Sequence, residues 1–431
     1  MKRENCSLES AGCSMVVAVT QDSVNATLKE YLDNFDGEFT NQAYCVDVDE
    51  TGSVVYESMD YEEVKKAVGM DLYTIPKEKE KWTKEQEAAL HKAYEELGFT
   101  LGFRFRIGLP EAKDPSSLRD IVTFLESDSS SIANVHYTMY LKEFEIIKIA
   151  VVPRKGYVFT NLKQDPDKPW YFTSRVKLDM KGEKFAELPE EIQDKLKPKD
   201  SQGHLSMDQI LSIQQLYMDL NTAKLTDDFE LEGFDKSDEI YHLFQSGFLN
   251  NYVEECRKKG GIILGYLAKQ FEPSGKREFI KLEDFNFCIT PYYKEDGGTD
   301  KEKQGLYSLN YLFSSPGHKM GDLKKYANAV RWNWVETSEK GSIHGRMAVD
   351  REGLLEQFAK HFRTTLECVQ LTPHAEASVN LVKASYKVWM TPDDSQAVFQ
   401  YGQNKYTYSY AQKAEAHDSY LNTVDPGFSE T

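Results

Sequence analysis

Apolar and polar residues alternate along much of this chain, and a period of two residues is typical of β-strands with one buried face. The run Phe103–Ile107 alternates apolar with basic side chains. Val135–Leu141 is rich in strand-forming residues, and Phe144–Val152 follows after a short polar break, so these two segments are candidates for a hairpin. Further strands are predicted at Tyr157–Leu162, Trp170–Met180, Phe285–Tyr293, Leu306–Phe313, Val330–Val335, Val379–Met390 and Ala397–Tyr401.

Three segments carry a helical pattern instead. Thr83–Leu97 is followed by Gly98, and Ile240–Lys258 is followed by Gly260-Gly261, as is common where a helix ends. In Ser206–Leu220 the apolar residues recur at intervals of three and four, and the first serine can cap a helix. We therefore predict helices over these three ranges.

A strand followed by a capped helix is predicted near both ends of the chain. Met15–Leu32 begins with an apolar strand and continues, after a threonine, as an amphipathic stretch. Arg346–Phe362 repeats this order, with Ala348-Val349 aligned to Ala18-Val19 and Asp350 at the capping position. Such units also arise by chance, so an internal repeat and a coincidence both remain open.

The chain is long enough for two or three domains, although a single elongated β-rich unit with a few helices also fits. We predict an N-terminal β-rich half over residues 1–200, a helical segment over 201–260, and a C-terminal β-rich half over 261–431. The second strand–helix unit, residues 346–362, belongs to the C-terminal half.

The charge of the chain narrows the choice of partners. Its 431 residues include 52 Lys and Arg against 70 Asp and Glu, a formal net charge of −18. Nucleic acids and anionic membranes attract basic proteins, so neither is expected as a main partner. The 25 Tyr, 23 Phe and 5 Trp distinguish the chain from acidic disordered proteins, which contain few aromatic residues. We expect a large aromatic core, and the sequence does not indicate an oligomeric state.

The apolar segments are too short for a membrane span. The longest, Ile146–Val152, contains Lys148 and falls far below the roughly 18–20 apolar residues that a span requires. No apolar region of a secretory signal follows the first basic residues. Six Cys without a CxxC pair favour free thiols in a reducing cytosol, and a Cys6–Cys13 disulfide is the alternative. The sequence therefore predicts a cytoplasmic protein without a membrane span.

The short motifs of common cofactor and metal enzymes are missing from the sequence. It contains no GxGxxG, GxxxxGK[ST], GxSxG, HExxH or paired-Cys zinc pattern. We therefore predict no cofactor and no metal site. Two functions then remain open: cofactor-free catalysis on a hydrophobic small molecule, and simple binding of such a molecule.

The segment before residue 347 combines aromatic rings with hydrogen-bond donors. Trp332 and Trp334 would share one face of a strand, where they could line an apolar cavity or form ordinary sheet core. His344 and Arg346, also two apart, could donate to a substrate oxygen that gains negative charge, although lone residues of these types are more often structural. The predicted catalytic residues are thus His344 and Arg346, and the predicted substrate-binding residues are Trp332, Trp334, Tyr307, Tyr311 and Trp389.

The two strand–helix units, Met15–Leu32 and Arg346–Phe362, resemble the opening of TULIP (tubular lipid-binding) proteins and of their relatives in bacterial toxin clusters. This resemblance implies an α+β, β-rich fold. Strongly curved antiparallel sheets would pack on long amphipathic helices and enclose an apolar cavity. The resemblance covers these two segments only.

The opening of the chain also resembles a second group of proteins. The segments Asn5–Leu8, Ala11–Val19 and Asp22–Thr27 are similar to fungal biosynthetic-cluster proteins associated with tropolonic sesquiterpenoids, among which hetero-Diels–Alderases act. No active-site residue can be carried over from this resemblance. The two resemblances are compatible, because an apolar chamber could serve as a reaction site.

We therefore expect a cofactor-free enzyme of fungal secondary metabolism that binds polyketide or terpenoid substrates in an aromatic pocket, as a Diels–Alderase-type pericyclase would. The alternatives are a non-enzymatic TULIP-type protein that binds lipids or other hydrophobic ligands, and a toxin-accessory protein that acts through its acidic surface. A short closed aromatic cavity favours the enzyme. A continuous aliphatic tunnel favours the carrier, and a stable protein partner favours the accessory protein.

Overall fold

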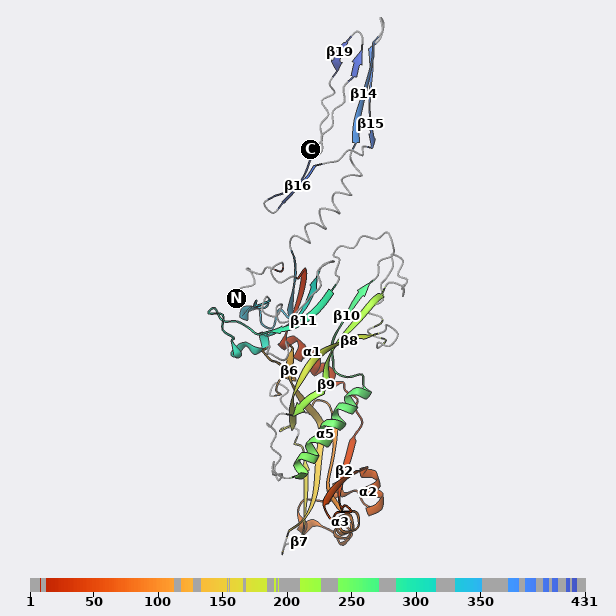
Figure 1. The fold of residues 1–431 in the computed structure, drawn as a ribbon, viewed down its shortest axis with the longest axis vertical. Coiled ribbons are helices and arrows are strands. Elements are labelled where there is room, and N and C mark those ends of the chain that lie inside the picture. The colour runs from red at the N-terminus through yellow and green to blue at the C-terminus, as the bar shows by residue number, and fades with distance from the viewer. Residues whose placement is uncertain are drawn as a thin grey trace.

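The fold is described from a computed structural model of the chain. The structure describes, apart from a few single residues, the following parts of the chain: 13–111, 118–126, 133–152, 156–165, 168–183, 210–225, 239–270, 284–314, 330–350 and parts of 371–424. Beyond residue 370 it describes backbone strands and few side chains. The β-rich, antiparallel character that the alternating pattern predicts is confirmed (Figure 1).

The larger sheet is antiparallel, contains nine strands and curls into a half-barrel (Figure 1). These strands are β2 (Thr40–Val48), β3 (Val54–Met59), β4 (Phe99–Ile107), β5 (Val122–Phe124), β6 (Asn134–Val152), β7 (Gly156–Lys163), β8 (Tyr171–Glu183), β9 (Ile210–Leu225) and β10 (Ile263–Gln270). The main path is β10-β9-β8-β6-β4-β2-β3, and β5 and β7 pair with β6 beside it. The 19-residue β6 therefore joins the two ends of the sheet.

Helix α5 (Glu239–Lys258) packs along the inner face of this half-barrel (Figure 1). Phe244, Phe248 and Tyr252 recur every four residues, so they form one stripe, and all three are fully buried. At Gly247 the helix comes so close to β2 that an added Cβ would clash with Tyr44 Oη. A side chain at this position would therefore hold the helix away from the sheet.

Two of the three predicted helices are confirmed. Thr83–Leu97 corresponds to α3 (Lys84–Leu97), where Thr83 and Gln86 form a capping box and Gly98 ends the helix in a left-handed conformation. Ile240–Lys258 corresponds to α5. The other described helices are α1 (Gln21–Asp33), α2 (Tyr61–Val68) and the 3₁₀ turns η3 (Leu72–Thr74), η4 (Lys79–Lys81), η8 (Lys301–Leu306) and η9 (Thr337–Glu339). Of the helices described here, none is long and apolar enough to cross a bilayer.

The prediction of a helix at Ser206–Leu220 is wrong, because this segment contains the start of strand β9. Leu216, Met218 and Leu220 are buried and alternate, so the sequence fits a period of two as well as the helical spacing. β9 lies between β8 and β10 and pairs with both. The local sequence fits a helix and a strand equally well, and pairing with β8 and β10 makes this segment a strand.

Strand β6 replaces the two strands predicted at Val135–Leu141 and Phe144–Val152. The polar residues between them do not break the strand. Glu143 pairs with Arg106 of β4, their charged groups lie 3.4 Å apart, and the register shifts by one residue at Lys142. The candidate hairpin is therefore wrong, because the polar break is a local irregularity within one strand.

Three two-stranded hairpins follow at the far end of the molecule (Figure 1). The predicted single strand Val379–Met390 is wrong, since it covers the last residue of β14 and most of β15, which pair with each other. The predicted strand Ala397–Tyr401 corresponds to β16. The hairpin strands are β14 (Leu371–Val379), β15 (Ala384–Pro392), β16 (Val398–Gly402), β17 (Lys405–Ser409), β18 (Ala416–Asp418) and β19 (Leu421–Val424).

A smaller four-stranded antiparallel sheet brings the two predicted strand–helix units together. Its order is β11-β12-β1-β13, so the N-terminal strand lies in its interior. The strands are β1 (Met15–Thr20), β11 (Asp284–Thr290), β12 (Ser308–Ser314) and β13 (Gly345–Val349). After β1, the side chain of Thr20 accepts a hydrogen bond from Ser23 N–H, so Thr20 caps α1 as predicted.

The contact between β1 and β13 has local two-fold symmetry. Val17 pairs with Met347, which is also its counterpart when the two units are aligned. Thr20 N–H donates to His344 C=O at 3.0 Å, and Asp350 N–H donates to Ser14 C=O at 2.7 Å. The register of this antiparallel pair therefore coincides with the alignment of the two units. The rest of the second unit, residues 351–362, lies outside the described residues.

Candidate functional site

Several of the predicted site residues lie in one lobe beside the smaller sheet, formed by residues 291–307 and 330–346, which we call the tyrosine–tryptophan lobe. Tyr292 donates a hydrogen bond to Glu336 Oε2 at 3.0 Å. The ammonium nitrogen of Lys303 lies 4.8 Å from the centre of the Tyr292 ring. Charged partners therefore hold this lobe together along with ring packing.

Trp332 and Trp334 are buried in this lobe and contact each other edge to face, with ring centroids 5.7 Å apart and planes at 82°. The prediction that residues 330–335 form a strand is wrong. Instead, the Asn333 side chain accepts a hydrogen bond from Tyr293 N–H and donates one to Tyr293 C=O, both at 2.8 Å. The Asn333 side chain thus fixes the backbone of Tyr293 against this segment.

The two predicted catalytic residues stand at the start of β13 in different surroundings. The side chain of His344 is exposed, while its carbonyl accepts hydrogen bonds from the N–H and Oγ1 of Thr20. Arg346 is partly buried and forms an ion pair with Glu339, at 2.5 Å between Nη2 and Oε1. Arg346 is therefore already occupied by a carboxylate, and His344 faces solvent.

The predicted aromatic residues are only partly brought together. Tyr307 is buried with the tryptophans in one hydrophobic cluster, and burial raises its pKa to about 12. Tyr311 packs against the edge of that cluster and stacks on Phe285 of β11, with centroids 6.2 Å apart. Trp389 lies on β15 in a distant hairpin, opposite His374, and its side chain is outside the described residues (Figure 1).

The largest aromatic cluster lies elsewhere, between α5 and the curled sheet. Rings from β4, β6 and β8 face the rings of the helix. The closest pair is Phe172 and Phe248, which stack with centroids 4.0 Å apart, and Phe105 lies 5.0 Å from Phe248. The cluster, which we call the aromatic interior, comprises Phe103, Phe105, Phe144, Phe172, Phe244, Phe248 and Tyr252.

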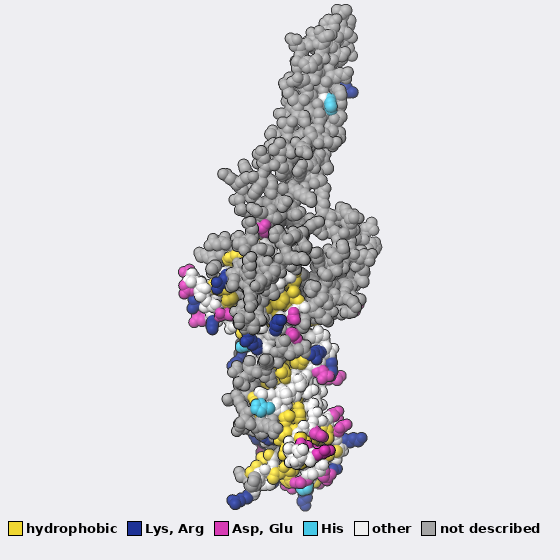
Figure 2. Space-filling view, viewed as in Figure 1, with side chains coloured by type: hydrophobic (Ala, Val, Ile, Leu, Met, Phe, Trp, Pro, Cys, Tyr) yellow, Lys and Arg dark blue, Asp and Glu magenta, His cyan; other side chains and the backbone are white. Residues whose placement is uncertain are grey.

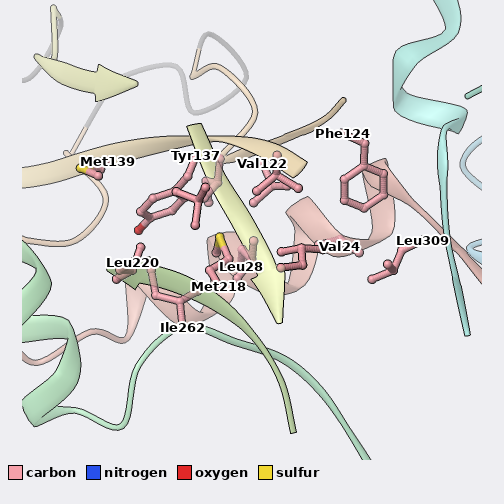
Figure 3. Close-up of a cluster of buried hydrophobic side chains, with 14 of the residues drawn as sticks. Val24, Leu28, Val122, Phe124, Tyr137, Met139, Met218, Leu220, Ile262 and Leu309 are labelled. Atoms are coloured by element: carbon pink, nitrogen blue, oxygen red, sulfur yellow. The ribbon is translucent and has the colours of Figure 1, made fainter. Parts of the chain in front are cut away.

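One polar pair lies at the edge of the aromatic interior. The hydroxyls of Tyr137 on β6 and Tyr252 on α5 are 2.7 Å apart, and both residues are fully buried. Burial raises the pKa of both phenols well above 10, so both are neutral at physiological pH. Figure 3 shows the Tyr137 ring next to Met139 and Leu220. The hydroxyl pair is thus set among apolar side chains.

An open groove lies where α1 and α5 end. Its volume is about 620 Å³, and its lining includes the aromatic rings of Tyr31 and Phe35, which meet edge to face at 5.7 Å. Polar and charged side chains line the remainder. The full lining is Thr27, Glu30, Tyr31, Asn34, Phe35, Asp36 and Lys259.

Tyr31 connects this groove with the aromatic interior. Its hydroxyl donates to Gly261 C=O, just after α5, at 3.3 Å. Tyr31 lies close enough to Tyr137 and Tyr252 for its charge to affect the pKa of both. Burial, with a smaller contribution from Cys256, raises the pKa of Tyr31 itself to about 12. Tyr31 therefore lines the groove and also lies in the neighbourhood of the hydroxyl pair.

The sequence contains signals for this site that the sequence prediction did not combine. Phe103 and Phe105 alternate on β4, while Phe244, Phe248 and Tyr252 repeat at helical spacing. Each pattern indicates a buried face, but neither indicates that the two faces meet. Within the described ranges, His, Cys, Asp and Glu side chains form no group of three or more that could hold a metal ion.

The chain matches no protein-family model, and no curated protein is similar to it in sequence.

Proposed function

We propose that this protein binds an elongated hydrophobic small molecule between α5 and the curled sheet, as a TULIP-type binding protein would. The observation that carries the proposal is the aromatic interior, where a helix and the inner face of an antiparallel half-barrel present rings to each other. An apolar, aromatic lining with a few placed polar groups is typical of sites for small hydrophobic ligands. A helix along the inner face of a curled antiparallel sheet is an arrangement that a tubular binding protein would use.

Access to this interior requires α5 to move, because its rings touch those of the sheet. The end of the helix supports such a motion. Gly260 and Gly261 follow α5 with φ of +89° and +84°, a conformation that glycine adopts without strain. The groove opens at this same end, and Tyr31, which lines it, donates a hydrogen bond to Gly261 C=O. A ligand would enter by the groove and slide between α5 and β4.

Lipid that co-purifies with the protein gives the first test. Native mass spectrometry of the purified chain should show bound hydrophobic molecules, and the neutral dye Nile red should bind with roughly micromolar affinity. Thr27→Trp should weaken dye binding by about tenfold, because the new ring fills a groove of ligand size. Thr27 is exposed on α1, so this variant should fold normally.

Ala26→Trp is the matched control. Ala26 is also exposed on α1 but does not line the groove, so the same ring there should leave dye binding unchanged. Equal losses in the two variants would contradict the proposed route. A folded wild-type protein that holds no lipid and binds no dye would contradict the proposed function.

A cofactor-free pericyclase is the second candidate, and the tyrosine–tryptophan lobe favours it. Arg331 Nε donates to Tyr293 Oη at 3.3 Å, next to the buried Trp332 and Trp334. Ring surface and donors in one place suit a reaction whose transition state carries charge on a heteroatom. Holding two reactants in a productive pose can lower the barrier by roughly 7–11 kcal/mol in the best cases.

This second candidate predicts stereoselective cyclisation of a terpenoid alkene with a heterodiene. One stereoisomer should form in excess over the uncatalysed reaction. Arg346→Gln should slow that reaction by about a hundredfold if Arg346 supplies a donor to the transition state. A product ratio equal to the background ratio would exclude the pericyclase and leave the binding function intact.

A further inference from the structure

The hydroxyl pair of Tyr137 and Tyr252 contains more donors than it uses. Each phenol carries one proton, and the 2.7 Å contact between the two oxygens consumes one of the two. Among the described residues, neither oxygen has a second hydrogen-bond partner. One buried O–H donor therefore has no protein acceptor, an arrangement that native interiors rarely keep without a role.

Among the described residues, no positively charged group affects the pKa of either phenol, and the nearest ammonium along the groove, that of Lys259, lies beyond Tyr31. The ionisable groups that affect the pKa values of the two phenols are Tyr31 and Cys256. Burial raises the pKa of both to about 12, so both stay neutral at physiological pH. A carboxylate placed here would be a buried charge without a partner, which is strongly unfavourable.

The apolar neighbours of the pair are adaptable. Met139, Met218, Leu220 and Ile262 are buried around Tyr137 (Figure 3). Methionine side chains are flexible and polarisable, so they can repack around an inserted group more easily than branched side chains. The site therefore combines one unused donor, no charge and a deformable wall.

We infer that the bound molecule is a neutral amphiphile whose hydroxyl or carbonyl oxygen accepts the remaining phenol proton of the Tyr137–Tyr252 pair, while its hydrocarbon part lies among the rings of the aromatic interior. This inference rests on the proposed binding function. It selects long-chain alcohols, ketones, sterol-like or terpenoid compounds, and it rejects fatty acids.

Three probes of equal chain length test the inference: 1-dodecanol, dodecane and dodecanoate, each competing with Nile red. Dodecanol should bind about tenfold more tightly than dodecane, the equivalent of one hydrogen bond of about 1.4 kcal/mol. Dodecanoate should bind most weakly. The double variant Tyr137→Phe/Tyr252→Phe should bind dodecanol about tenfold more weakly than the wild type and dodecane equally well.

The double variant is preferable to either single one, because a single change leaves the remaining hydroxyl buried alone. Tyr140→Phe is the matched control. Tyr140 is buried on the same strand, but its hydroxyl donates to Arg119 C=O at 3.2 Å, so all three affinities should stay unchanged. Circular dichroism and thermal melting would show that the variants are folded.

The possible failures are distinguishable. Tightest binding of dodecanoate, or a double variant that keeps its preference for dodecanol, would overturn the inference while the binding function stands. A folded wild-type protein that binds none of the three probes would overturn the function, and the inference with it.

Discussion

Two regions of this molecule are rich in buried aromatic rings, and they differ in what surrounds the rings. In the aromatic interior, rings meet rings, and the hydroxyls of Tyr137 and Tyr252 meet only each other. In the tyrosine–tryptophan lobe, Tyr292 is bonded to Glu336 and Tyr293 to Arg331. In the lobe, phenols thus form hydrogen bonds with charged side chains, although Arg346 Nε is buried there without a hydrogen-bond partner among the described residues. In the interior, the buried donor without an acceptor is a phenol among apolar side chains.

This difference shows that an abundance of aromatic residues does not identify a ligand site. Rings that are tied to charged partners stabilise a loop structure, because each hydrogen bond requires one geometry. Rings that contact only other rings can slide and repack. We therefore place ligand binding in the interior. On the face shown in Figure 2, acidic and basic side chains are intermixed over the lower described part. That part of the face therefore shows no patch of one charge sign that would indicate a charged ligand.

The largest effect is expected at the centre of the aromatic interior. Phe248→Ala removes a fully buried ring that contacts Phe105, Phe144 and Phe172. The free energy of unfolding should fall by about 3–5 kcal/mol, as for other buried Phe→Ala changes. Denaturant titration measures this loss. Leu249→Ala, on a partly buried side of the same helix, is the control and should cost clearly less.

The lobe should depend instead on a hydrogen-bonding side chain. Asn333→Ala leaves the buried N–H and C=O of Tyr293 without their partners, so we expect a loss of about 2–4 kcal/mol. Asn250→Ala, at an exposed position on α5, should change stability little. A loss at Asn333 no larger than that at Asn250 would show that ring packing alone holds the lobe.

Alkaline pH should destabilise the interior. Folding raises the pKa of Tyr137 and Tyr252 well above 10, so both phenols stay protonated in the native state while they ionise in the unfolded chain. The contribution of these two phenols to the free energy of unfolding is therefore fully present below pH 10. Above pH 10 the free energy of unfolding falls by about 1 kcal/mol per pH unit for each buried tyrosine. Denaturation midpoints at increasing pH measure this slope. The double variant Tyr137→Phe/Tyr252→Phe should show a shallower slope, and an unchanged slope would refute the assignment.

The smallest effects are expected at the two predicted donors. Arg346→Gln breaks a partly exposed ion pair with Glu339 and should cost about 1 kcal/mol or less. His344→Ala changes an exposed side chain and should alter the free energy of unfolding by less than about 0.5 kcal/mol. With stability so little affected, any large loss of cyclisation rate in these variants would point to catalysis in the lobe.

Local signals predicted many elements of the fold correctly. The capping box at Thr83 and the glycine at 98 define the ends of α3 from neighbouring residues alone. Alternation located the end of β4, where Phe103, Phe105 and Ile107 are buried and the arginines between them are partly exposed. Strand-forming residues also located β7. At Ser206–Leu220 the sequence fits both a helical and a strand period. There, pairing with strands that are distant in sequence determined that a strand forms.

The candidate site was harder to predict for the same reason. Trp332 and Trp334 stand two residues apart, which predicts a strand, but residues 330–335 form none, and the Asn333 side chain holds the segment to the backbone of Tyr293. Tyr137 and Tyr252 stand 115 residues apart, and nothing near either one indicates the other. Spacing along a chain identifies faces of elements, and it cannot identify which faces meet.

The sequence by itself determined that this protein is β-rich, acidic and filled with aromatic residues, because alternation, charge and composition are local properties. Only the tertiary structure decided that α5 packs along the inside of a curled sheet and that β1 and β13 join the two ends of the chain. It also decided that the phenols of Tyr137 and Tyr252 share one hydrogen bond in an apolar setting. These features depend on contacts between residues far apart in sequence. Such contacts form, and stabilise the protein, only when the chain folds.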